Sequence, residues 1–407
     1  MKTLKESHAA ISTVLAFALI PLSGFATDIY LPSFPAMAVL FGTSQADIQL
    51  SLVVFVVSNG ISQLFVGSLL DTFGRYRLSI ASLVVFALSS FIIAETHSLP
   101  VLLSMRIIQG IAIALIVVGK RAFFIDLYTG SRLKHYTSLF SIMWATAPII
   151  APFLGGFLQH YFGWQSNFYF LGFTTLAILT LELIYSGETL KSPQVFKVST
   201  LLNIYASKLK TFDFSVSLFI LGSAFSMVIV FNMASPFIIQ HIFHASAVTI
   251  GYCSLLSGVA ILAGGLISKS MINRPLATKM RIVAPLLITF STAMIMTMTY
   301  LPSLVTFMII VILTHMASGF TFNTFYTFAL GRFSSNAGIV SGITGGGTYI
   351  ITSILSFSVI TVLQVQDLVM LGTAYLTLAT LISVAFIIFS FAQKRILAIQ
   401  AQTVAAV

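Results

Sequence analysis

Charged side chains are scarce in this chain of 407 residues, where Asp, Glu, Lys and Arg together account for 7% of the sequence. Soluble domains carry about 25% charged residues. The mean hydropathy of +1.03 leaves no polar shell that would cover a water-soluble protein of this length. The composition therefore excludes a soluble enzyme, a nucleic-acid-binding module and a disordered protein, and it predicts an integral membrane protein.

Cysteine is nearly absent as well. The one cysteine, Cys253, lies in an apolar run, so no intramolecular disulfide can form. The closest approach to a metal-binding pattern is the pair His241 and His244, which lacks an acid. The phosphate-binding pattern GxxxxGK[ST] is missing too, because Ala114 stands where its first glycine should be. We expect no metal, no cofactor, no ATP-driven pumping and no enzymatic activity.

Long apolar runs dominate the sequence instead. They are continuous over about 20 residues, the length of a membrane-spanning helix, and they lack the alternation of a transmembrane β-strand. The predicted fold class is all-α, with twelve transmembrane helices in two six-helix bundles. The expected spans are residues 9–33, 47–69, 78–95, 99–119, 135–160, 166–186, 213–238, 246–268, 281–299, 302–330, 337–363 and 368–391.

The longest connection between spans divides the chain into two sets of six. It predicts an N-terminal six-helix bundle over residues 1–186, a cytoplasmic linker over 187–212 and a C-terminal six-helix bundle over 213–407. Two bundles joined in this way are typical of transporters whose binding site lies between them, near the middle of the membrane.

Basic residues set the orientation. With twelve spans and both termini in the cytoplasm, every Lys and Arg except Arg106 falls in a cytoplasmic segment, as the positive-inside rule requires. The first span has a second interpretation, because Lys2, Lys5, an apolar stretch and the small residues at 24–26 also resemble a cleaved signal peptide. Cleavage would leave eleven spans; we favour the retained helix.

Two charges lie where a bilayer makes them costly, by about 2.5–3.5 kcal/mol each on insertion scales. Asp28 is the only charge between Ala9 and Ala46, and Arg106 lies inside the fourth span. Asp28 is either a carboxyl that binds and releases a proton or a carboxylate satisfied by water at the outer interface. Arg106 stays ionised, and it either stabilises that carboxylate or bonds to carbonyls and Gln109 in a structural role.

Other polar residues within the spans are weaker candidates. Glu182 lies near the inner end of the sixth span, where it can snorkel toward water. The second half is almost free of charge, and its notable polar side chains are Asn232, His315 and Asn323. Each of these is either a helix-packing contact or a ligand-binding group.

A glycine-containing connection follows the second span and reads Gly67-Ser-Leu-Leu-Asp71-Thr-Phe-Gly74-Arg75-Tyr-Arg77. Asp71 is expected to accept hydrogen bonds from amides at a helix N-terminus, and Arg75 to bridge to a neighbouring acid. We interpret this connection as a latch that joins helices on the cytoplasmic face.

Small residues and prolines are concentrated in the fifth span, which contains Ala147-Pro148-Ile-Ile-Ala151-Pro152-Phe-Leu-Gly155-Gly156. Residues 147, 151 and 155 lie four apart and therefore share one helix face, which permits close packing. The two prolines make a bend in this helix an expectation.

These stretches resemble the motifs of a known family. Residues 67–77 match the GxLxDxxGRxx loop motif of the major facilitator superfamily, although Thr72 and Tyr76 replace basic residues. Residues 106–110 match its RxxQG motif, and the fifth span is similar to its antiporter motif. Residues 27–32, Thr-Asp-Ile-Tyr-Leu-Pro, look like the TDxYLP of Bcr/CflA-type drug-resistance transporters.

The resemblance implies a proton-coupled antiporter that exports a small, partly apolar, drug-like molecule by alternating access. It assigns proton coupling to Asp28 and Arg106. It assigns the cytoplasmic gate and the span-five motif to Gly67, Asp71, Gly74, Arg75, Asp126, Pro148, Pro152, Gly155 and Gly156. We expect the substrate cavity to be lined by Tyr30, Met143, Trp144, Phe231, Asn232 and Asn323.

Three alternatives to multidrug efflux stay open: a dedicated metabolite or siderophore transporter of the same fold, a uniporter, and a non-transporting receptor or scaffold built on a transporter fold. The expected partners are a small-molecule substrate, protons and the lipid bilayer, with no nucleic acid. We expect a monomer in a bacterial inner (cytoplasmic) membrane that uses the proton gradient as its energy source and needs no cofactor.

Overall fold

The computed structural model describes residues 2–190, 192, 198–333 and 337–405, and within helices it leaves some side chains undescribed, that of Trp144 among them. The first half of the chain contains η1 (Glu6–His8), α1 (Ala9–Leu19), α2 (Leu22–Asp28), η2 (Leu31–Ser33), α3 (Phe34–Phe41), α4 (Gln45–Phe73), α5 (Arg75–Glu95), α6 (Leu99–Leu127), α7 (Gly130–Phe162) and α8 (Gln165–Tyr185). The second half contains α9 (Val198–Leu209), α10 (Phe212–His241), α11 (Ala247–Ser270), α12 (Leu276–Tyr300), α13 (Leu304–Gly331), α14 (Ala337–Leu363) and α15 (Leu368–Ala405).

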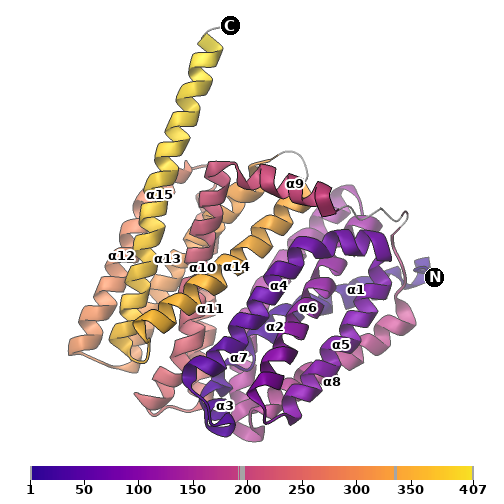
Figure 1. Cartoon of the computed structure of the whole chain (residues 1–407), viewed down its shortest axis with the longest axis horizontal. Coiled ribbons are helices and arrows are strands. Elements are labelled where there is room, and N and C mark those ends of the chain that lie inside the picture. Colours follow the sequence, from indigo (N-terminus) through magenta and orange to yellow (C-terminus); the bar gives the residue numbers. More distant parts are fainter. Residues whose placement is uncertain (1, 191, 193–197, 334–336, 406–407) are drawn as a thin grey trace. The chain divides into compact units, whose positions relative to one another are not determined.

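The helices form two compact units, drawn in Figure 1. Unit 1 comprises Met1–Lys197 and Ser235–Gly258, and unit 2 comprises Val198–Ala234 and Val259–Val407. The end of α10 and the beginning of α11 therefore pack with the first half of the chain, although the sequence pattern assigns both to the second bundle. The division into two bundles of six spans stays a prediction.

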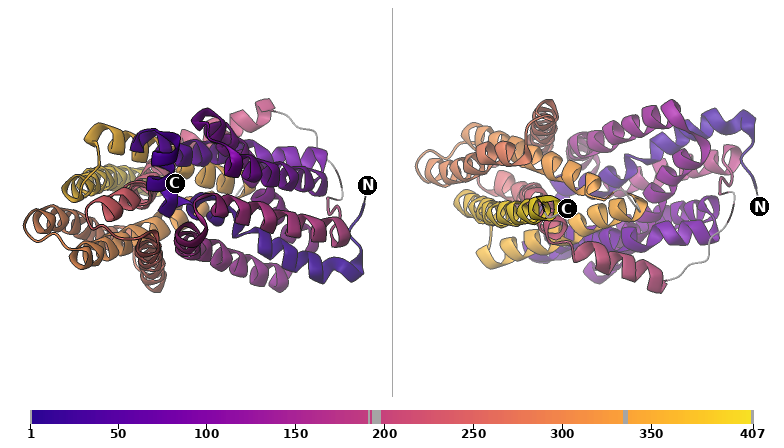
Figure 2. Two further views of the ribbon diagram at one scale, coloured as in Figure 1. Left: turned by 90° about the horizontal axis from the view of Figure 1, so that it is seen from below. Right: turned by 90° about the horizontal axis from the view of Figure 1, so that it is seen from above.

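Unit 1 is built around α6. Helices α4 and α5 both pack on α6, and α5 also packs on α8 (Figure 1). Figure 2 gives two further views of the same ribbon. The outward face of α5 presents Val84, Leu88 and Ile92, each more than a third exposed. These residues lie four apart and form one apolar stripe, which suits contact with lipid.

Unit 2 packs α12 against α13 and α15. Glycines let α11 and α13 approach closely, because a Cβ at Gly264 or Gly319 would overlap a backbone carbonyl of the facing helix. The C-terminal end of α15 projects beyond the other helices of this unit (Figure 1).

Eleven candidate membrane spans occur among the described residues. They coincide with the predicted spans except that at 135–160, which corresponds to α7, a helix that contains undescribed side chains. The chain is thus an all-helical, multi-pass membrane protein. The number twelve and the cytoplasmic location of both termini stay predictions.

Three local expectations are corrected. The first span is a broken helix that runs on to Phe41, because prolines at 21, 32 and 35 lack the amide donor that a continuous helix needs. The fourth span extends to Leu127, which places Lys120, Arg121 and Asp126 on α6 and not in a loop. The predicted linker contains a helix, α9.

Candidate functional site

Asp28 and Arg106 lie in the interior of unit 1. Asp28 is the last residue of α2, at the break in the first span, and 4% of it is exposed. Arg106 lies on α6 and is fully buried. The two residues interact electrostatically, so the structure brings together the two charges that the sequence singles out within the membrane.

The guanidinium of Arg106 is held from several directions. Its Nη1 donates to the carbonyl of Ala26 at 3.0 Å and to Oε1 of Gln109 at 2.8 Å, and its Nε donates to the carbonyl of Ser51 at 3.4 Å. Its Nη2 has no hydrogen-bond partner among the described residues. The contacts with carbonyls and Gln109 fit the structural interpretation of Arg106, and its electrostatic interaction with Asp28 fits the coupling interpretation.

Two aromatic rings enclose the same guanidinium. Its central carbon lies 4.5 Å from the ring centroid of Tyr30 and 4.1 Å from that of Phe55. Such cation–π contacts are strongest where water is excluded. The hydroxyl of Tyr30 also shares a 3.0 Å hydrogen bond with Ser51. Tyr30 is fully buried and packs on Arg106, although the sequence pattern predicts it as a cavity-lining residue.

Asp71 and Arg75 of the loop motif form a cluster of ions with Asp126 of α6. From here on, the latch means these three residues. Helix α4 ends at Phe73, and Gly74 turns the chain with a φ of 94°, a backbone conformation that glycine tolerates and other residues resist. Arg75 donates to Asp71 at 3.1 Å and forms an ion pair with Asp126. The contacts expected for Arg75 are present.

The expected contact of Asp71 is not among those described. Its carboxylate lies in the last turn of α4 and accepts from Arg75. The first amides of α5 donate instead to Glu188, which follows α8. No local pattern signals this contact, because the two segments are more than a hundred residues apart.

The fifth-span motif contacts two neighbours within unit 1. On one side, a Cβ at Gly155 would overlap the carbonyl oxygen of Ile29, at the break in the first span. On another side, a Cβ at Gly156 would collide with Ala247 and Gly251 at the beginning of α11. The close packing expected from the small residues is present, and Pro148 and Pro152 lie inside α7.

The other predicted cavity residues divide between the two units. Met143 lies on α7 of unit 1 and is partly buried, and the side chain of Trp144 lies outside the described residues. In unit 2, Phe231 is fully buried against the ring of His315, Asn232 is 9% exposed and Asn323 is partly buried.

Sequence reasoning also missed buried polar contacts between helices, of which two are notable. Lys120 on α6 donates to both carboxylate oxygens of Glu182 on α8, at 2.8 and 2.7 Å, in a pair that is almost fully buried. Glu182 therefore does not snorkel. In unit 2, His315 shares a 2.9 Å hydrogen bond with Tyr375, and both are fully buried. The isolated charges of Lys120 and Glu182 were visible in the sequence, but their pairing was not.

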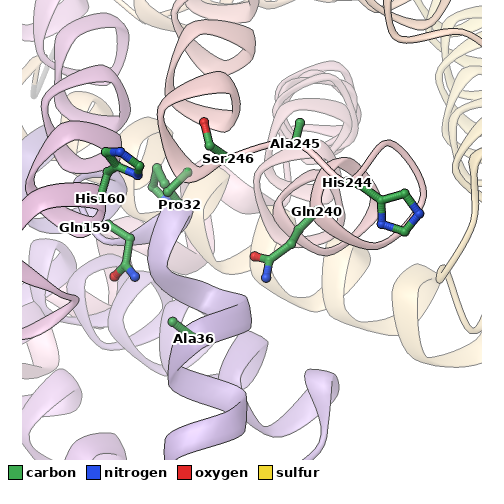
Figure 3. A pocket seen from close by; sticks show the side chains of 9 residues that line it. Pro32, Ala36, Gln159, His160, Gln240, His244, Ala245 and Ser246 are labelled. Atoms are coloured by element: carbon green, nitrogen blue, oxygen red, sulfur yellow. The ribbon is translucent and has the colours of Figure 1, made fainter.

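A pocket of about 510 Å³ lies at the end of unit 1 where α7 terminates. In Figure 3, Gln159 and His160 lie on one side of it, Pro32 and Ala36 come from the first span, Gln240 comes from the end of α10, and Ser246 comes from the connection between α10 and α11. The residues described in its lining include no Asp, Glu, Lys or Arg, so hydrogen-bonding groups of Gln, His and Ser lie there beside Pro and Ala side chains.

Comparison with known sequences gives matches along most of the chain. The sequence model of the Major Facilitator Superfamily matches residues 16–356. An uncharacterized MFS-type transporter of Bacillus subtilis, YdgK, is 28% identical over 346 residues, which is 81% of this chain and 83% of that protein. The bicyclomycin resistance protein homolog of Haemophilus influenzae is 29% identical over 206 residues, 51% of each chain.

A further relative, multidrug resistance protein D of Escherichia coli, is 29% identical over 153 residues, 38% of this chain and 39% of that protein. The chain thus spans about half, or less, of the length of these two resistance proteins. Among solved structures, a mutant of the nucleoside transporter NupG has a TM-score of 0.70 at 15% identity, covering 94% of this chain and 99% of that one. This last similarity concerns the fold alone.

Proposed function

The chain belongs to the Major Facilitator Superfamily, and on that premise we propose that it is a proton-coupled secondary transporter that exports a small, partly apolar, drug-like molecule by alternating access. The observation that carries the proposal is the interacting pair of Asp28 and Arg106, buried inside unit 1. A bilayer penalises isolated charges, so a charged pair at this depth marks a functional position.

The chemistry assigns different roles to the two residues. Arginine stays ionised at any accessible pH and cannot itself carry the proton, whereas the carboxyl of Asp28 can exist in both forms. Arg106 is fixed by three hydrogen bonds and two aromatic rings. It therefore acts as a stationary positive charge that interacts with the carboxyl of Asp28.

Exchange follows from competition at this position. A proton that enters from outside neutralises Asp28, and a substrate binds better when the carboxyl is ionised. Each ligand then weakens the binding of the other, and this reciprocal coupling links outward movement of substrate to inward movement of protons. The cavity residues proposed for the substrate are Tyr30, Met143, Trp144, Phe231, Asn232 and Asn323.

Relatives with resistance names support a drug-like substrate. We assign the protein to the inner membrane of a bacterium, as a monomer with twelve spans and both termini in the cytoplasm. In this account the proton gradient supplies the energy, and the latch of Asp71, Arg75 and Asp126 takes part in gating at the cytoplasmic face.

Transport in proteoliposomes tests the proposal. We would measure movement of radiolabelled chloramphenicol and of tetraphenylphosphonium with and without an imposed pH gradient. Substrate transport by the wild type should depend on the pH gradient, and transport by Asp28→Asn should not. Asp367→Asn is the matched control, because Asp367 is an exposed carboxylate that caps α15 by accepting from the amide of Met370 at 2.7 Å.

Two results would contradict the proposal. Transport that is indifferent to the pH gradient in the wild type would indicate a uniporter. Gradient-driven transport that survives in Asp28→Asn would show that Asp28 is not the residue that binds the transported proton.

A further inference from the structure

Helix α5 begins under unfavourable conditions. Its N-cap is Gly74, which offers no side-chain cap, and its first turn carries Arg75 and Arg77 at the positive end of the helix dipole. The first amides of a helix have no partner within the helix. Something else in the molecule must therefore satisfy them.

Glu188 supplies that partner. Its Oε1 accepts from the amide of Arg75 and its Oε2 from the amide of Tyr76, both at 3.1 Å. Oε1 also accepts from the amides of Thr189 and Leu190, at 3.1 and 3.0 Å. Only 8% of Glu188 is exposed, so these four bonds are made where water competes weakly and a carboxylate gains most from them.

The same segment contacts the latch a second time. The hydroxyl of Thr189 donates to Oδ2 of Asp126 at 2.9 Å. Arg75, whose amide donates to Glu188, extends its side chain to Asp71, to Asp126 and to the carbonyl of Ala122. The chain that leaves α8 is thus attached to both the backbone and the side chains of the latch.

A short strap, formed by residues Lys2–Leu4, holds Glu188 from the other side. Thr3 and Glu188 form a parallel β-bridge. The backbone amide of Glu188 donates to the carbonyl of Lys2 at 2.8 Å, and the backbone amide of Leu4 donates to the carbonyl of Glu188 at 3.3 Å. The ammonium of Lys2 also donates to the carbonyls of Leu183 and Ile184 at the end of α8, where the helix dipole favours a cation.

We propose that Glu188 is a positioning residue of the latch, and that the strap holds Glu188 in place and so sets how readily the latch opens. Gly187 provides a way to separate the two effects. A Cβ there would lie 2.5 Å from the amide nitrogen of Leu4, so even alanine should displace the strap while leaving Glu188 intact.

Hydrogen exchange on the full chain in detergent tests the first step. The amides at 75 and 76 should be protected in the wild type, although they are the first of a helix. Glu188→Gln should raise their exchange about tenfold or more, because hydrogen bonds to a charged group are lost. Glu95→Gln removes the same charge from the opposite, exposed end of α5 and should leave them protected.

Thiol labelling tests the second step. In a Cys253→Ser background, which removes the only native cysteine, Ala122→Cys places a half-buried reporter under Arg75. Glu188→Gln and Gly187→Ala should each raise its maleimide labelling rate, measured well below the melting temperature of each variant. Gly331→Ala, where the added Cβ meets open space, should not.

Each outcome decides a part of the proposal. Unchanged exchange at 75 and 76 in Glu188→Gln would show that the cap is unimportant. Faster amide exchange with an unchanged labelling rate in Glu188→Gln would make Glu188 a local helix cap without influence on the latch. An unchanged labelling rate in Gly187→Ala would show that the strap does not influence the latch. Neither readout needs a substrate or a pH gradient, so failure here is distinct from failure of proton-coupled export.

Discussion

The buried pair of Lys120 and Glu182 allows a quantitative prediction about stability. Both oxygens of Glu182 accept from Lys120, and neither side chain has appreciable contact with solvent. Removing one partner leaves the other as an uncompensated buried charge, which costs about 3–5 kcal/mol. Replacing both with apolar residues of similar volume is often neutral or stabilising.

The magnitude can be converted into a melting temperature. Unfolding entropies of about 2.1 cal/mol/K per residue make a loss of about 4 kcal/mol equivalent to a fall of roughly 5 °C for a chain of this length. We expect a fall of this size for Glu182→Met and for Lys120→Met. The double variant Lys120→Met with Glu182→Met should melt close to the wild type.

The assay is thermal unfolding in detergent, followed by intrinsic fluorescence, with Glu95→Gln as a control for loss of an exposed charge. Additive effects in the double variant would refute the reasoning, since they would show that the two side chains do not stabilise each other. The pair joins α6, which carries Arg106, to α8, so the result also bears on how the candidate site is held.

Three further predictions concern single positions. Arg106→Lys should lower gradient-driven transport about tenfold or more, because a lysine cannot reproduce the planar set of donors; uptake into proteoliposomes measures this. Gly155→Ala should lower the yield of folded protein, since its Cβ overlaps the carbonyl of Ile29, whereas Gly347→Ala meets only an ordinary contact at 3.7 Å and should fold normally; size-exclusion chromatography compares them. Gly74→Ala should destabilise by about 1 kcal/mol through its positive φ, a change of roughly 1 °C that differential scanning fluorimetry detects if replicates are averaged.

Much of the fold follows from the sequence because the membrane imposes a simple rule. A run of about 20 apolar residues must become a helix, since every backbone group has to be satisfied internally. The same rule identifies Asp28 and Arg106, because a charged residue inside an apolar run is conspicuous in the sequence. Both residues lie in unit 1 and interact electrostatically.

The contacts between distant segments could not be predicted in this way. Glu188 looks like an ordinary loop acid after a span, and only the folded chain brings it to the first amides of α5. Lys120 and Glu182 look like residues at the membrane surface, because each is near the inner end of a run. Which charges meet depends on how the helices pack, and a single sequence carries no measure of that.

Proton release on ligand binding tests the central claim most directly. Chloramphenicol and tetraphenylphosphonium would be added to purified protein in weakly buffered detergent solution, and a pH indicator would report protons released by the wild type and by Asp28→Asn. The account predicts release by the wild type and none by the variant. Binding by the wild type without release of protons would contradict competition between substrate and proton at Asp28.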